Sequence, residues 1–324
     1  MSEPQKARVM RKRRQAHLPV GPSSIALFRL GEQCNNACPM CSNSGRPEAF
    51  HQGRSELLQR VGFLESQGIR RVVLTGGEPT IHRGFWDVVD ALRSAGIVWD
   101  INTHGRSFSE DTFTDTCIRR GLKRAIVSFH SHELEASCII SGIDERGHQE
   151  TVEGIENLID GGVSVTLNCV LSTFNQGKLC DYLRFCSQLF GREHVTKFVF
   201  PSTIGKGGSW DGIQLSFTSV REEIRAVKSL ADELGMEAQF ESFPNCILGD
   251  SDSRNMGRSG FGETHYLDDI TGSNLYPINY IEAQLSMYPE RCKPCAALKK
   301  CCGISESYAL RYGYEELLPF TESP

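Results

Sequence analysis

Long apolar runs are missing from this chain of 324 residues. No stretch approaches the roughly 20 apolar residues that span a bilayer, and no apolar segment follows the basic run KARVMRKRRQ near the N-terminus. The net charge of −5 gives no general attraction to nucleic acid or to anionic lipid. We therefore expect a cytoplasmic protein that binds neither membrane nor nucleic acid, with residues 1–23 as a solvated basic arm.

Internal repeats and low-complexity tracts are also missing. The number of cysteines is odd, so they cannot all pair as disulfides. Thirteen cysteines fit a reducing compartment, in which thiols bind metals or pack in the core. Five of them lie within predicted helices or strands and are interpreted as small buried hydrophobes: Cys117, Cys138, Cys169, Cys180 and Cys186. The others form two groups, one early in the chain and one towards its C-terminus.

Strand-like and helix-like segments alternate regularly from residue 24 to residue 201. Apolar runs predict strands at residues 24–30, 71–77, 97–105, 124–130, 163–172 and 194–201. Helical spacing of apolar residues predicts helices at residues 55–68, 85–96, 110–121, 148–162 and 178–191. Apolar strands joined through helices imply parallel pairing with right-handed crossovers. The sequence therefore predicts an α/β fold, either an open sheet or a complete or partial barrel.

Polar residues gather where the predicted strands end. A cysteine loop follows the first strand, and the segments TGGEPT, NTHGR and SFHSH end the next three. Asn168 lies late in the fifth strand. Because chemistry in such folds collects at the carboxyl ends of the strands, we expect a single active site on this rim.

After Pro201 the chain changes character. A glycine-rich connection leads to one predicted helix at residues 219–235 and one strand at residues 236–242. Residues 245–290 show little periodicity, and a loop of that length needs a tether, for which the flanking cysteines are candidates. We predict a core at residues 24–201 and a smaller C-terminal domain at residues 202–324.

The loop GEQCNNACPMCSNSG spaces Cys34, Cys38 and Cys41 as C-x3-C-x2-C. A structural zinc site normally takes four ligands, whereas three thiolates on a [4Fe-4S] cluster leave one iron open. The segment TGGEPT then places Gly76, Gly77 and Glu78 at a strand end. Its glycines permit close backbone approach, and its carboxylate attracts a cationic group. Zinc, coincidental thiols and a plain strand-to-helix turn are the alternatives.

Together the two motifs resemble those of the radical S-adenosylmethionine (SAM) superfamily, over residues 24–201. The resemblance implies a partial (β/α)6 barrel in which the three cysteines hold a [4Fe-4S] cluster. It implies that Gly76, Gly77 and Glu78 grip the methionine amino group of SAM, with further SAM contacts from Thr103, Ser128 and Asn168. A donor such as flavodoxin or ferredoxin would supply the electron that cleaves SAM to a 5'-deoxyadenosyl radical. Met40 stands where the family usually has an aromatic residue, and its thioether can still shield the cluster.

The C-terminal segment RCKPCAALKKCCG spaces Cys292, Cys295 and Cys301 as C-x2-C-x5-C, for which zinc is again an alternative. In a radical SAM context it resembles part of the SPASM or twitch extension, which carries auxiliary [4Fe-4S] clusters. Several cysteines of the full SPASM pattern are missing. The resemblance therefore implies one auxiliary cluster, with Cys246 or Cys302 as the fourth ligand. Cys246 is alternatively a free thiol that returns a hydrogen atom to the substrate.

Two reactions on a small-molecule substrate fit one auxiliary cluster: dehydrogenation, and epimerisation with a thiol donor. Family members with a twitch extension suggest a sugar, cyclitol or aminoglycoside substrate in antibiotic biosynthesis. A peptide maturase is the main alternative, although the segment before the first strand is too short for a leader-peptide-binding domain. A cyclase like that of molybdenum cofactor synthesis, whose second cluster binds substrate, is another, but its double-glycine ending is absent. A zinc-stabilised binding module is the non-enzymatic alternative. His130 and His132 are either proton shuttles or residues merely hydrogen-bonded on the rim.

Overall fold

The computed structural model describes residues 20–21, 23–42, 52–201, 210–249, 255–256, 263–267, 272–278 and 285–321. Most of the predicted basic arm at residues 1–23 lies outside these residues. Among the described residues, no helix is long and apolar enough to cross a membrane.

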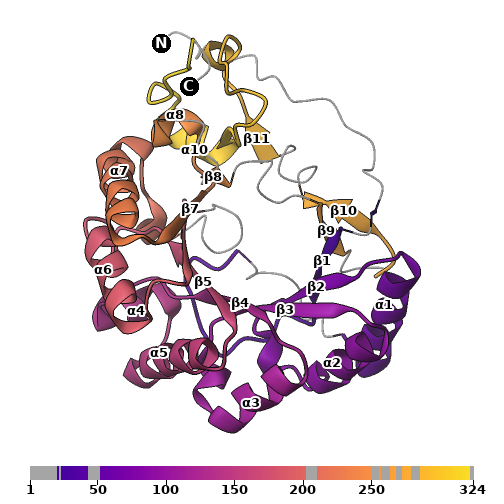
Figure 1. Cartoon of the computed structure of the whole chain (residues 1–324). Helices are drawn as coiled ribbons and strands as arrows, with labels where there is room; N and C mark the ends of the chain where they lie inside the picture. Colours follow the sequence, from indigo (N-terminus) through magenta and orange to yellow (C-terminus); the bar gives the residue numbers. More distant parts are fainter. Residues whose placement is uncertain are drawn as a thin grey trace.

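A mostly parallel sheet organises the described part of the chain (Figure 1). Its strands are β1 (Ile25–Arg29), β2 (Arg71–Thr75), β3 (Val98–Thr103), β4 (Arg124–Ser128), β5 (Ser164–Val170), β6 (Val195–Val199), β7 (Glu237–Glu241), β8 (Asn255–Met256), β9 (Thr264–Leu267) and β10 (Leu275–Pro277). The spatial order is β10-β9-β1-β2-β3-β4-β5-β6-β7-β8, and only the β9–β10 pair is antiparallel. The predicted α/β fold with parallel strands is therefore confirmed, and β1 to β6 lie side by side in chain order.

Helices follow most strands, and those between residues 54 and 234 lie on the outer side of the curved sheet in Figure 1. They are α1 (Arg54–Ser66), α2 (Phe85–Ser94), α3 (Asp111–Arg119), α4 (Leu134–Ser141), α5 (Glu145–Asp160), α6 (Leu179–Leu189), α7 (Phe217–Leu234), α8 (Asn245–Leu248) and α10 (Glu306–Tyr312). The sequence analysis did not anticipate α4, which has only eight residues and ends at Gly142 in the left-handed conformation, with φ 60°. So short a helix gives a weak periodic signal.

Burial alternates along the strands, which separates the two faces of the sheet. In β4 and β6 every second residue is buried, and the residues between them are half-buried or, at the start of β4, exposed. The buried set includes Trp99, Phe198 and Phe240, which are at most 1% exposed and belong to the main hydrophobic core. One face of the sheet thus forms the core, and the residues on the other face stay available for ligands.

The C-terminal part of the chain adds strands to both ends of the sheet. β7 pairs with β6, while β9 lies parallel to β1, with Leu27 opposite Tyr266. The segment 245–290, which showed little periodicity, contains β8, β9 and β10, strands of two to four residues that are too short to produce a clear pattern. The predicted domain boundary at residue 201 therefore does not coincide with an edge of the sheet.

The last described segment is anchored on α7. Phe217 at the start of α7 stacks on Tyr308 of α10 with ring centroids 4.3 Å apart, and its backbone N–H donates to the Tyr308 hydroxyl at 2.7 Å. That hydroxyl donates in turn to Glu316 at 2.7 Å. A two-stranded sheet of β11 (Ser286–Met287) and β12 (Ile304–Ser305) lies beside α10 in Figure 1. These contacts hold the C-terminal cysteines against the rest of the fold.

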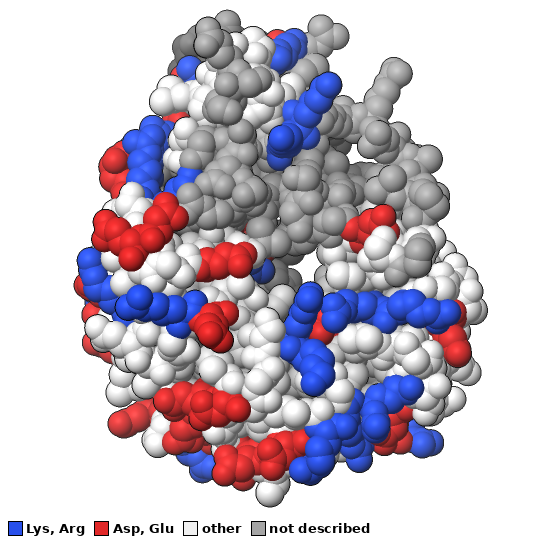
Figure 2. All heavy atoms as spheres, viewed as in Figure 1, with Lys and Arg blue, Asp and Glu red and all other residues white. Residues whose placement is uncertain are grey.

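The face of the molecule shown in Figure 2 carries acidic and basic side chains interspersed. Local ion pairs also join the outer helices, such as Arg120 with Asp90 at 2.9 Å. Exposed pairs of this kind contribute little to stability. The surface charge of this face therefore indicates no particular partner.

Candidate functional site

The loop that carries Cys34, Cys38 and Cys41 follows β1 and is fixed by the turn after β2. The backbone N–H of Gly77 donates to the Gly31 carbonyl at 2.8 Å, and the N–H of Glu78 donates to the Gln33 carbonyl at 2.7 Å. A Cβ atom on Gly77 would lie 2.2 Å from the Gln33 carbonyl oxygen. Gly76 has φ +138°, and a Cβ there would lie 2.4 Å from the Gly31 oxygen.

These glycines are therefore needed where two backbone segments touch. The sequence analysis assigned their freedom to contact with a ligand. The structure shows that the cysteine loop itself occupies that side of the turn. Contact of Gly76 and Gly77 with SAM stays a prediction.

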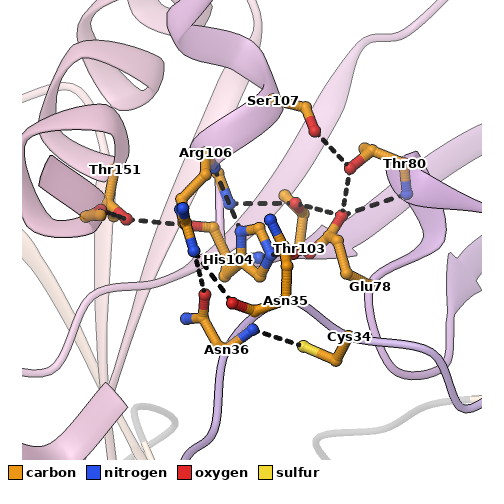
Figure 3. Close-up of polar contacts among 12 residues, drawn as sticks. Cys34, Asn35, Asn36, Glu78, Thr80, Thr103, His104, Arg106, Ser107 and Thr151 are labelled. Carbon is orange, nitrogen blue, oxygen red and sulfur yellow. Dashed lines mark hydrogen bonds and ion pairs between the residues drawn. The ribbon is translucent and has the colours of Figure 1, made fainter. Parts of the chain in front are cut away.

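The Glu78 carboxylate is buried, at 2% exposure, and accepts hydrogen bonds at both oxygens (Figure 3). Oε1 accepts from the Thr80 hydroxyl at 2.7 Å and from the Thr103 hydroxyl at 2.8 Å, and Oε2 accepts from the His104 N–H at 2.9 Å. Thr103, a predicted SAM contact, thus binds Glu78 directly. This network joins the ends of β2 and β3 and makes the turn rigid.

Two residues that the sequence analysis missed, His104 and Arg106, hold the cysteine loop from the side of β3. His104 Nε2 lies 2.6 Å from Asn35 Oδ1, and Arg106 Nη1 donates to the Asn35 carbonyl at 3.0 Å (Figure 3). Burial lowers the pKa of His104, so its ring is neutral at pH 7. The backbone N–H of Arg106 donates to His104 Nδ1 at 3.2 Å. The hydrogen of the neutral His104 ring therefore sits on Nε2 and points to Asn35.

The end of α4 supports the same loop from a third direction. The Ala37 N–H donates to the Gly142 carbonyl at 3.2 Å, and a Cβ on Gly142 would lie 2.3 Å from the Ala37 carbonyl. The Cys38 thiol donates to the Ser141 carbonyl at 3.2 Å. The NTHGR motif drew attention to the end of β3, but no local signal pointed to α4.

Burial and the charges of neighbouring loop thiols raise the pKa values of Cys34 and Cys38. The repulsion between the thiolates indicates whether they suit a metal cluster. Burial, with the charges of Cys41 and Cys34, raises the pKa of Cys38 to about 12. Burial also raises the pKa of Cys34, and the guanidinium of Arg106 opposes this. Three close thiolates repel one another unless a cationic centre binds them, so this donor set fits an iron–sulfur cluster with one open iron.

Ser128 and Asn168 lie opposite each other on β4 and β5, on the half-buried face of the sheet. The next residue in this row is Lys197 of β6, whose Nζ pairs with Glu241 Oε2 of β7 at 2.8 Å. The Lys197 and Glu241 side chains are 13% and 20% exposed. Hydrophobic patterns along the sequence do not reveal this pair, because single charged residues within a strand leave no period.

Four of the five C-terminal cysteines line one apolar pocket: Cys246, Cys292, Cys295 and Cys301. Leu298, Leu317 and Pro319 supply part of its apolar lining. Burial, with the charges of Cys301, Cys246 and Cys295, raises the pKa of Cys292 to about 12. The four thiols are therefore close enough to act on one another.

Cys302 does not line this cavity, and its thiol donates to the Gly303 carbonyl at 3.3 Å. Within the described ranges, no three histidine, cysteine or acidic side chains are arranged to hold a single metal ion. A four-iron cluster is wider than one ion and takes thiolates that stand further apart. The cavity, with four thiols and an apolar lining, fits such a cluster.

His130, which follows β4, is buried at 4% exposure and bonded into the fold. Its Nδ1 accepts from the Val170 N–H at 3.2 Å, and Asn175 donates to its carbonyl at 2.8 Å. Burial lowers its pKa from 6.5 to about 4. A neutral, buried ring of this kind indicates a structural role rather than proton transfer.

This burial predicts a pH dependence of stability. In the unfolded chain His130 binds a proton below about pH 6.5. In the folded chain it binds one only below about pH 4. The free energy of unfolding should therefore fall as the pH drops, by about 2 kcal/mol between pH 7 and pH 5. Urea titrations of the wild type and of His130→Asn at both pH values test this. Equal pH dependence in the two proteins would contradict it.

Comparison with known proteins agrees with this geometry. The model of the Radical SAM superfamily matches residues 28–186. Residues 28–186 therefore form a radical SAM superfamily domain, which carries the cysteine loop, the Gly76–Gly77 turn and the strands β2 to β5. The match ends before the second cysteine group, so the SPASM or twitch extension stays a prediction.

The curated relatives that the chain matches include cyclases. A probable GTP 3',8-cyclase of Thermococcus kodakarensis is 32% identical over 170 residues, covering 52% of this chain and 54% of that protein. The chain thus spans about half the length of the first curated relatives that it matches.

Two solved structures share the fold. Streptococcus suis SuiB bound to S-adenosylmethionine superposes with a TM-score of 0.63 at 11% identity, covering 92% of this chain and 76% of SuiB. SuiB has also been solved with its precursor peptide SuiA. The protein anSMEcpe with bound AdoMet gives a TM-score of 0.62 at 13% identity, covering 90% of this chain and 95% of its own. At these identities the likeness concerns the fold alone.

Proposed function

We propose that this chain is a radical SAM enzyme that binds a [4Fe-4S] cluster at Cys34, Cys38 and Cys41, and SAM beside it. The observation that carries the proposal is the three-thiol loop, held by backbone contact against the Gly76–Gly77 turn within a radical SAM domain. When bound, cluster and SAM supply a 5'-deoxyadenosyl radical that removes a hydrogen atom from the substrate. A one-electron donor such as flavodoxin or ferredoxin is the required partner.

The residues of this chain have distinct tasks in that proposal. Glu78, bonded to Thr103 and to the His104 backbone, keeps the turn in place beside the cysteine loop. Ser128 and Asn168 offer a hydroxyl and an amide to SAM from the half-buried face of the sheet. Lys197 continues the same row, and Glu241 lies two residues beyond the β7 residue opposite Lys197. We assign this pair to the substrate space, where a charge pair binds hydroxyl or other polar groups.

At the second site we propose an auxiliary [4Fe-4S] cluster with Cys246, Cys292, Cys295 and Cys301 as ligands, in a twitch-like C-terminal domain. Four thiolates give every iron a protein ligand. This supports Cys246 as a ligand rather than as a hydrogen-atom donor. A cyclase whose second cluster binds its substrate would instead need an iron without a protein ligand.

A fully ligated auxiliary cluster favours dehydrogenation over epimerisation, because it supplies an electron acceptor and engages Cys246, the thiol predicted as the hydrogen-atom donor. The comparisons give no support to a sugar, cyclitol or aminoglycoside substrate, or to antibiotic biosynthesis. We propose a small-molecule substrate, and the relatives named for GTP favour a nucleotide. The peptide-bound structure of SuiB keeps a peptide as the alternative.

Metal analysis tests the proposal directly. Anaerobically reconstituted protein should hold about eight irons per chain for two four-iron clusters, and with dithionite it should cleave SAM to 5'-deoxyadenosine. Zinc without iron would instead support the binding module. Once a substrate is found, turnover in heavy water separates the reactions, since only epimerisation with a thiol donor places deuterium at the reacting carbon.

Replacement of Cys246 by alanine distinguishes its two possible roles. As a ligand, its loss should lower iron from about eight towards about four per chain while SAM cleavage at the first site persists. Cys302→Ala, which changes a thiol outside the cavity lining, is the matched control and should keep all the iron. Full iron in Cys246→Ala would show that Cys246 is not a ligand and would favour the donor role.

A further inference from the structure

We propose that Arg106 sets the reduction potential of the cluster at Cys34, by fixing the hydrogen bond that the loop backbone donates to the Cys34 sulfur. The inference rests on the proposed function, since the cluster is part of it. Arg106 acts through the loop and is a positioning residue.

The guanidinium of Arg106 bridges α5 and the cysteine loop. Its Nε pairs with Glu150 Oε2 at 2.7 Å. Its Nη1 donates to the Asn35 carbonyl at 3.0 Å and to Asn36 Oδ1 at 3.1 Å (Figure 3). The Arg106 and Glu150 side chains are only 18% and 19% exposed. Partial burial and several hydrogen bonds in a fixed planar fork restrict this arginine far more than an exposed ion pair would.

Asn36 links the guanidinium to the sulfur. Its side chain accepts from Arg106, and its backbone N–H donates to Cys34 Sγ at 3.4 Å (Figure 3). Asn35, the residue before it, is held twice, by Arg106 at its carbonyl and by His104 at its side chain. The peptide between Asn35 and Asn36, which carries the donating N–H, therefore has little freedom to rotate.

A hydrogen bond to a ligand sulfur withdraws negative charge, which favours the reduced and more negative state of a cluster. The positive charge of Arg106 acts in the same direction. Because Glu150 fixes the guanidinium on α5, the loop cannot shift to lengthen the N–H···S contact without breaking these bonds. Loss of Arg106 should thus make the cluster harder to reduce.

The test is a redox titration of the full reconstituted chain, monitored by EPR. The signal that changes when SAM is added identifies the cluster at Cys34, and its potential is the one measured. Arg106→Gln should lower the ratio of reduced to oxidised cluster about tenfold at a fixed potential, a shift of about 59 mV for one electron. Arg106→Lys keeps the charge but loses the fork, so its shift should be smaller.

Arg120→Gln is the matched control, because it removes an arginine paired with Asp90 on the outer helices, and it should leave the potential unchanged. Full iron with an unchanged potential in Arg106→Gln would overturn the inference. If Arg106→Gln fails to hold iron, Arg106→Lys decides, and an unchanged potential there overturns it equally. A wild type that binds no iron would overturn the proposed function instead.

Discussion

Replacing Cys38 by alanine is expected to abolish SAM cleavage and to lower the iron content by about four atoms per chain. The thiol lies at the centre of the loop, where the charges of both other cysteines act on it. Two remaining thiolates cannot hold a cluster that already has one open iron. Iron analysis and chromatographic detection of 5'-deoxyadenosine measure the two effects.

The control for this variant is Cys180→Ala, which removes a half-buried thiol from α6. It should keep full iron and full SAM cleavage. The iron that remains in Cys38→Ala reports on the auxiliary site, which the substitution does not touch. Unchanged iron and cleavage in Cys38→Ala would refute the assignment of the loop as the cluster site.

Replacing Gly77 by alanine should be nearly as severe, although Gly77 carries no side chain and binds no metal. The new Cβ would lie 2.2 Å from the Gln33 oxygen and 2.5 Å from the Glu32 oxygen, both in the backbone of the cysteine loop. The turn and the loop must then separate, which breaks the backbone hydrogen bonds between them. We expect a loss of about 2–4 kcal/mol in the free energy of unfolding, with weaker iron binding at the first site.

Gly62→Ala provides a contrast of opposite sign. Gly62 lies within α1, and a Cβ there would meet no atom within 4 Å. Alanine favours a helix interior by about 1 kcal/mol over glycine, so this variant should be slightly more stable. Urea unfolding of both variants without metal measures the difference. Similar stabilities for the two would contradict the close approach of the turn and the loop.

Most of the fold was predictable because its core elements are long enough to show a period. The strands β1 to β6 and the helices between them repeat apolar residues over five or more positions. The exceptions share one cause. Helix α4 has eight residues, and β8 to β10 have two to four, so their sequences carry little information about their conformation. Their positions depend on the sheet and helices that they contact.

The candidate site also has parts that were predictable from the sequence and parts that were not. The loop of three cysteines and the Gly76–Gly77 turn are local patterns, so the sequence alone determined which residues form them and which chemistry they suit. Contacts between distant segments left no such pattern. Arg106 binds a carbonyl 71 residues away, and Cys38 donates to one 103 residues away.

Only the tertiary structure decided that Cys246 joins Cys292, Cys295 and Cys301 in one cavity while Cys302 stays outside it. It also decided that Gly76 and Gly77 meet the cysteine loop, and that Arg106 holds the peptide beside Cys34. The physical reason is that side-chain chemistry decides which residues can bind a cluster, and the sequence alone gives that chemistry. Which ligands converge follows from packing, which depends on residues far apart along the chain.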